Sequence, residues 1–164
     1  MNIFDQAMDI EKEGEALYRQ FSLGASDEGM KHVFTWLADQ ERKHYEIFEK
    51  MKAGKSASVE ESTLLHDVKD IFVGWKDIAN SMGVKVSEAD LYRRALDSEN
   101  KSVLVYESYA NASATGQQKD IFLAIAKEEK RHQWILRNII EFVTKPEVWA
   151  ENAEFDHLEE DYYL

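Results

Sequence analysis

The sequence has no cysteine, a single proline and no long apolar run. Without cysteine the chain forms no disulfide and no thiolate metal site, which excludes a cysteine-bound iron centre of its own. The scarcity of proline argues against a loop-rich β fold. No apolar run approaches the roughly 18 residues of a membrane span, and the first residues lack the basic run of a signal peptide. We therefore expect a cytoplasmic protein that makes no contact with a membrane.

Basic residues are also scarce, because 20 Lys and Arg stand against 32 Asp and Glu and leave a formal net charge of −12. A surface this acidic repels phosphate backbones, so no nucleic-acid partner is expected. Acids are enriched in a C-terminal tail at 146–164, which is read as a solvated tail rather than as a docking segment for a basic redox partner. The length of 164 residues fits one domain with a sizeable core.

Apolar residues recur at helical spacing over four long segments, so the predicted fold class is all-α. Turn and capping residues separate the segments. Ser26, followed by two acids, predicts the start of the second helix, and Gly54 predicts its end. Ser87 opens a sequence that resembles a capping box and predicts the start of the third helix.

The four predicted helices pair as two hairpins, at 3–53 and 87–144. They are joined by a crossover at 54–86, which is too long for a tight turn and carries a helical pattern of its own. Hairpin, crossover and hairpin are the order of a four-helix bundle with one long crossover connection that contains a short helix. The bundle is expected to occupy 1–145, and a short helix carrying Trp149 is expected at the start of the tail.

Two short stretches follow the same Glu-x-x-His pattern, since 41–44 reads ERKH and 129–132 reads EKRH. Each has a glutamate 30 residues upstream: Glu11 for the first (41 − 11 = 30) and Glu99 for the second (129 − 99 = 30). A shift of 88 residues (99 − 11 = 88) therefore aligns one half of the chain with the other. One Glu-x-x-His pair can easily arise by chance, but two pairs at equivalent positions of a repeat arise by chance much less often.

The spacing has a geometric meaning in a helical hairpin. Glu11 lies 15 residues before Ser26 and Glu41 lies 15 residues after it (26 − 11 = 15; 41 − 26 = 15). The two acids are therefore predicted at the same height, roughly 22 Å from the turn. The second hairpin repeats the arrangement around Ala114. Residues three apart share a helix face, so each histidine points where its glutamate points.

One glutamate from each of two helices, with Glu-x-x-His from each of the other two, is the ligand arrangement of di-iron and di-manganese carboxylate bundles. Two divalent ions would balance four carboxylates that are otherwise costly to bury. Oxygen and nitrogen ligands without sulfur favour iron or manganese and do not exclude zinc. The predicted metal ligands are Glu11, Glu41, His44, Glu99, Glu129 and His132.

Two tyrosines, Tyr18 and Tyr106, lie seven residues after the first ligand of each half (18 − 11 = 7; 106 − 99 = 7). Their hydroxyls are predicted to donate hydrogen bonds to ligand carboxylates, and the alternative is that both are core tyrosines bonded elsewhere. Glu128 precedes a predicted ligand but points about 100° away from it on the helix, so we expect it at the surface.

These residues resemble the rubrerythrin-like branch of the ferritin-like di-iron carboxylate superfamily over about residues 3 to 143. The resemblance is carried by EKEGEALY at 11–18, ADQERKH at 38–44, ENKSVLVY at 99–106 and AKEEKRH at 126–132. It implies a ferritin-like bundle with two iron ions and the six ligands above. It also implies that Glu41 and Glu129 bridge the two metals, whereas Glu11 and Glu99 are terminal ligands.

The chain departs from rubrerythrins proper in two respects. Those proteins carry an additional acid one turn after the third-helix ligand, toward which an iron moves on oxidation, and here that position is Ser102. They also carry a cysteine-bound rubredoxin domain, which this cysteine-free sequence does not contain. The resemblance therefore implies that electrons come in trans, from a rubredoxin-like donor protein.

The function that the resemblance implies is that of a non-haem di-iron oxidoreductase. Such a peroxidase reduces hydrogen peroxide or dioxygen with electrons from the partner protein, defends against oxidative stress and is expected here as a homodimer. Three alternatives stay open at this point: a ferroxidase or iron-handling protein, a dimanganese catalase, and a purely structural helical bundle.

Overall fold

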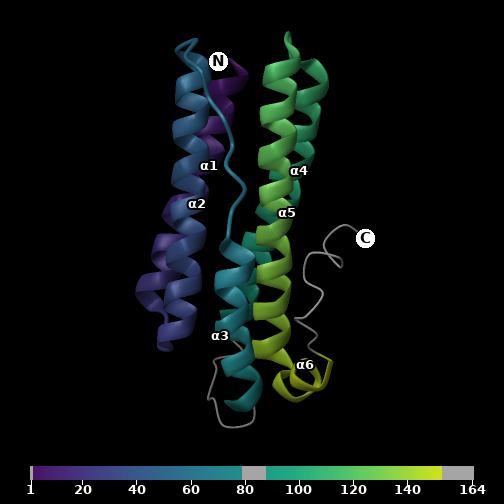
Figure 1. Cartoon of the computed structure of the whole chain (residues 1–164). Helices are drawn as coiled ribbons and strands as arrows, with labels where there is room; N and C mark the ends of the chain where they lie inside the picture. Colours follow the sequence, from purple (N-terminus) through teal and green to yellow (C-terminus); the bar gives the residue numbers. More distant parts are fainter. Residues whose placement is uncertain (1, 79–87, 153–164) are drawn as a thin grey trace. The chain divides into compact units, whose positions relative to one another are not determined.

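The computed structural model describes residues 2–78 and 88–152, and every regular element in these two ranges is helical. In chain order the helices are α1 (Ile3–Gly24), α2 (Glu28–Lys52), α3 (Leu64–Ile78), α4 (Ala89–Ala112), α5 (Gly116–Thr144) and α6 (Pro146–Asn152) (Figure 1). The prediction of an all-α protein is therefore confirmed. Among these helices none combines the length and the apolar character that a membrane span requires.

The order of helix lengths is that of a ferritin-like bundle with one crossover. Two long helices come first, the shorter α3 lies within the predicted crossover, and two further long helices follow. The helix α6 is the short helix expected around Trp149. The predicted helix start at Ser87 lies outside the described residues, as does the acidic tail from 153 onward.

Capping contacts explain where α2 begins and ends. The carboxylate of Asp27 accepts a hydrogen bond from the backbone N–H of Met30 at 2.8 Å, so the cap is one residue later than the predicted Ser26. After α2, Gly54 has a φ of +69°, a left-handed conformation that glycine adopts without steric cost. The prediction that Gly54 ends this helix is confirmed.

The chain divides into two compact units. Unit 1 comprises Met1–Glu61 and Lys101–Glu129, and unit 2 comprises Ser62–Asn100 and Lys130–Leu164. Both α4 and α5 contribute residues to each unit, because the division falls within these two helices.

Unit 1 contains the α1–α2 hairpin, whose two helices run side by side (Figure 1). A guanidinium nitrogen of Arg19 lies 2.8 Å from a carboxylate oxygen of Asp39, and the hydroxyls of Ser22 and Thr35 are 2.7 Å apart. Burial of apolar surface supplies most of the stabilisation, since a half-exposed ion pair such as that of Arg19 and Asp39 contributes little. The apolar cluster of this unit draws on α1, α2, α4 and α5 and consists of Ala7, Phe48, Met51, Tyr106, Ala110, Ile121, Phe122, Ile125 and Ala126.

Unit 2 is organised around aromatic rings. Trp75 of α3 stacks on Phe142 of α5, with ring centroids 4.5 Å apart and planes 12° from parallel. Trp149 of α6 meets the same phenylalanine edge-on at 5.0 Å, and its indole N–H donates to Asn138 Oδ1 at 3.1 Å. The side chain of Trp149 thus anchors the seven-residue helix α6 through ring contacts and a hydrogen bond.

We predict that Trp149→Ala lowers the free energy of unfolding by about 3–5 kcal/mol, because it removes a buried indole and leaves a cavity. Urea denaturation of the metal-free protein, followed by circular dichroism, measures this loss. The neighbouring Val148 is 51% exposed, so Val148→Ala is the matched control and should change stability by less than about 0.5 kcal/mol. Equal effects of the two substitutions would contradict the anchoring role of the indole.

Candidate metal centre

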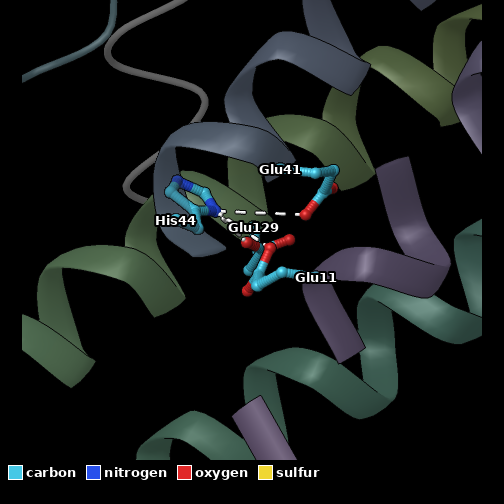
Figure 2. A group of neighbouring side chains, drawn as sticks. All are labelled: Glu11, Glu41, His44 and Glu129. Atoms are coloured by element: carbon cyan, nitrogen blue, oxygen red, sulfur yellow. Dashed lines mark ion pairs between the residues drawn. The ribbon is translucent and has the colours of Figure 1, made fainter. Parts of the chain in front are cut away.

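Three helices of unit 1 bring four of the predicted ligands together. Glu41 and His44 lie three residues apart on α2 and therefore share one face of that helix. Glu11 reaches them from α1, and Glu129 reaches them from α5 (Figure 2). All four residues are buried, and none is more than 3% exposed. Buried charge at this density needs compensation by a counter-charge or a bound cation.

The imidazole of His44 is the centre of this group. Its Nδ1 lies 2.8 Å from Glu129 Oε1, 3.4 Å from Glu11 Oε2 and 4.0 Å from Glu41 Oε2 (Figure 2). Three carboxylates thus surround one nitrogen that can carry a proton or bind a metal, but not both.

The donor set fits a divalent metal. Glu11, Glu41, His44 and Glu129 each offer one ligand atom, and these four atoms all lie within 4.8 Å of one another. Around an ion bound at about 2.1 Å, ligand atoms lie within about 4 Å of one another, so the group needs to contract only slightly. Three carboxylate oxygens and one imidazole nitrogen, with no sulfur, suit iron or manganese.

The charges around His44 change its titration in the metal-free protein. Burial by itself lowers the pKa of this imidazole, but the negative charges and hydrogen bonds of Glu11 and Glu129 outweigh burial and raise the pKa to about 10. At neutral pH the metal-free protein therefore holds an imidazolium among the carboxylates. A metal ion that takes this nitrogen must displace the proton.

Tyr106 of α4 donates a hydrogen bond from its hydroxyl to Glu11 Oε1. Burial, together with the negative charges of Glu11 and Glu129, raises the pKa of this phenol well above its usual value. The hydroxyl therefore stays protonated and remains a donor. Its ring packs against Phe48 and Phe122, with centroids 5.3 and 6.2 Å away, so apolar contacts hold the donor in place.

The other two predicted ligands meet each other in unit 2. His132 Nδ1 lies 3.4 Å from Glu99 Oε1, and both side chains are buried. This pair repeats the contact between His44 and Glu11 in unit 1, which has the same distance of 3.4 Å. Of the two predicted tyrosines, Tyr18 is also buried, and its ring packs on Phe34. The assignment of all these residues to metal binding stays a prediction.

The expected surface position of Glu128 is wrong, because this side chain is only 3% exposed. The expectation assumed that α5 buries a single face. Buried residues instead surround the helix at this level, namely Ile125, Ala126, Glu128, Glu129, Arg131, His132 and Gln133.

Sequence reasoning also missed Gly14 of α1. An ideal Cβ placed on this glycine would lie 3.2 Å from Glu41 Cδ. The signal was present in the sequence as a glycine in the interior of a helix, where alanine is the more favourable small residue.

Comparison with known proteins adds one finding. A rubrerythrin family model matches residues 2–85 and 90–159, which together are most of the chain. Neither the curated proteins nor the solved structures include one that matches the sequence.

We predict that the metal-free protein loses stability as the pH rises from about 6.5 toward 10. The pKa of His44 is raised in the folded state from 6.5 to about 10, so the stabilisation by its imidazolium is complete below 6.5 and is lost as the pH approaches the folded-state pKa. Urea midpoints measured with a chelator at pH 6, 7, 8 and 9 test this. His44→Gln should flatten the dependence in this window, and an unchanged slope in that variant would contradict the assignment.

Proposed function

Because the chain belongs to the rubrerythrin family of di-iron carboxylate proteins, we propose that it reduces hydrogen peroxide or dioxygen with electrons from a partner protein. The observation that supports this most is the buried group of Glu11, Glu41, His44 and Glu129 in unit 1. A buried set of acids with one imidazole has no evident purpose in a bundle that is merely structural, since apolar residues of similar volume would stabilise it at least as well.

We further propose that all six predicted residues hold two iron ions. Glu41 and Glu129, the acids of the two Glu-x-x-His pairs, would hold the ions together with Glu11 and Glu99. His44 and His132 complete the two coordination shells. The internal repeat and the equal histidine–glutamate distances of 3.4 Å in the two units support this symmetric assignment.

The side chains around the group have separate tasks in this proposal. When bound, the two irons supply the electrons, because reduction of one hydrogen peroxide to two water molecules consumes two electrons and two protons. The carboxylates balance the positive charge of the ions, and their burial excludes bulk water. Tyr106 keeps one oxygen of Glu11 occupied by its hydrogen bond, which leaves the other oxygen toward His44.

Electrons from another protein fit this cysteine-free sequence, which offers no thiolate iron centre that could supply them. A rubredoxin-like donor in trans is the proposed partner.

Ser102 is the observation that favours the second candidate function, a ferroxidase, because this buried serine stands where rubrerythrins proper carry an additional acid.

Metal analysis of two matched variants tests the proposed site. Protein loaded with Fe(II) without oxygen should hold about two irons per chain, and Glu129→Gln should lose one or both, because it removes a ligand and a negative charge. Glu128→Gln makes the same chemical change at the adjacent buried position, which lies outside the ligand group, and should retain the metal. Glu129→Gln protein with two irons per chain would contradict the assignment.

Reaction of the loaded protein separates the candidate functions. Catalytic peroxide consumption that requires a reduced donor protein supports the peroxidase, whereas oxidation of Fe(II) followed by release of Fe(III) would identify a ferroxidase. Purification with two manganese ions per chain, and peroxide consumption without a donor, would identify a catalase instead. Failure to bind any metal after anaerobic loading would leave a structural helical bundle.

We predict that Tyr106→Phe weakens metal binding by about 10- to 100-fold, as is typical when a hydrogen-bond partner of a metal ligand is removed. Competition with a chromophoric chelator measures the affinity. Tyr109→Phe is the matched control, because the hydroxyl of Tyr109 donates to Gln6 rather than to a carboxylate. It should leave metal affinity within about twofold, and a similar loss in both variants would remove the proposed role of Tyr106.

A further inference from the structure

A glycine lies in the interior of α1 where it weakens the helix. Gly14 is one turn after Glu11 and ten residues before the end of α1 at Gly24 (24 − 14 = 10). Glycine in a helix interior is unfavourable relative to alanine, because it loses more backbone freedom on folding. No turn or positive φ explains its presence, since the described residues contain a positive φ only at Gly54.

The surroundings of Gly14 supply a reason. A Cβ at this position would lie 3.2 Å from Cδ of Glu41 and 3.4 Å from both Cγ and Oε2 of the same side chain. Favourable contacts between carbon atoms begin at about 3.5 Å, so even a methyl group would press on the carboxylate. The Glu41 side chain therefore borders the space that a side chain at residue 14 would need.

This close approach is not a general property of helical glycines in the chain. Gly74 lies in the interior of α3, and a Cβ there would meet nothing within 4 Å. The repeat adds a second observation, because the shift of 88 places Gly14 on Ser102 (14 + 88 = 102). Both halves of the chain therefore carry a small residue one turn after their first predicted ligand.

We propose that Gly14 is a positioning residue that gives the Glu41 carboxylate its place in the metal-binding group. This inference rests on the proposed function and deepens it, because it names what sets the position of a proposed metal ligand. A methyl group at residue 14 would displace the Glu41 carboxylate by a few tenths of an ångström within a buried group. Metal sites tolerate ligand displacements of only about 0.5 Å, so a shift of a few tenths of an ångström takes up much of that tolerance, and we expect weaker binding.

The first test compares alanine at the two glycines in the metal-free protein. Gly74→Ala gains helix propensity without a new contact and should raise Tm by about 2–4 °C. Gly14→Ala gains the same propensity but presses on Glu41, so its rise should be smaller or reversed. In a Glu41→Asp background, where the side chain is one methylene shorter, Gly14→Ala should recover the full rise. Equal rises for the two glycines in the wild-type background would overturn the close contact.

The second test measures the site itself with Co(II), whose visible absorption reports the ligand geometry. The wild type and Gly74→Ala should give the same titration and the same spectrum. Gly14→Ala should bind at least one Co(II) about tenfold or more weakly and should change the absorption bands. A merely structural role of Gly14 would alter Tm but would move neither the affinity nor the spectrum.

The outcomes separate this inference from the function on which it rests. If the wild type binds Co(II) and Gly14→Ala binds it with the same affinity and spectrum, the role of Gly14 is overturned while the proposed function stands. If the wild type binds neither Co(II) nor Fe(II), both are overturned. A wild type that binds, together with an altered Gly14→Ala variant that recovers stability in the Glu41→Asp background, supports both.

Discussion

The burial of several carboxylates beside one imidazole is the constraint on which the rest of unit 1 depends. Each such carboxylate loses its hydration, and like charges at this separation repel one another strongly in a medium of low polarity. The protein meets this cost locally, with a proton on His44, the hydroxyl of Tyr106 and, in the proposed function, metal ions. The fold can therefore tolerate the buried carboxylates only while these partners stay within contact distance of them.

Packing of aromatic rings holds one of these partners, Tyr106, in position. Phe48 follows His44 by one turn on α2 and packs against both Tyr106 and Phe122. The same rings that bury apolar surface thus fix the direction of the tyrosine hydroxyl and limit the access of water to the carboxylates. Stability and chemistry are coupled here, because loosening the core would also raise the local polarity and weaken every electrostatic contact in the group.

The sequence predicted those features that follow from periodicity and spacing. Helical spacing predicted the all-α class. Gly54 marked the end of α2, because few residues other than glycine adopt the left-handed conformation found there. The spacing also singled out the four residues that unit 1 brings together. It could not predict the burial of Glu128, because a pattern along one helix does not reveal how many neighbours surround that helix. The sequence did not predict the role of Gly14 for a similar reason, since the space beside this glycine depends on how two helices pack.

The distribution of tryptophan has a consequence for optical measurements on this chain. Trp75, Trp134 and Trp149 belong to unit 2, whereas Trp36 is the one tryptophan of unit 1 among the described residues. Intrinsic fluorescence therefore reports mainly on unit 2, while the group of Glu11, Glu41, His44 and Glu129 lies in unit 1. A fluorescence melting curve and a metal-release curve would follow different parts of the molecule, and a separation between them would measure how cooperatively the two units unfold.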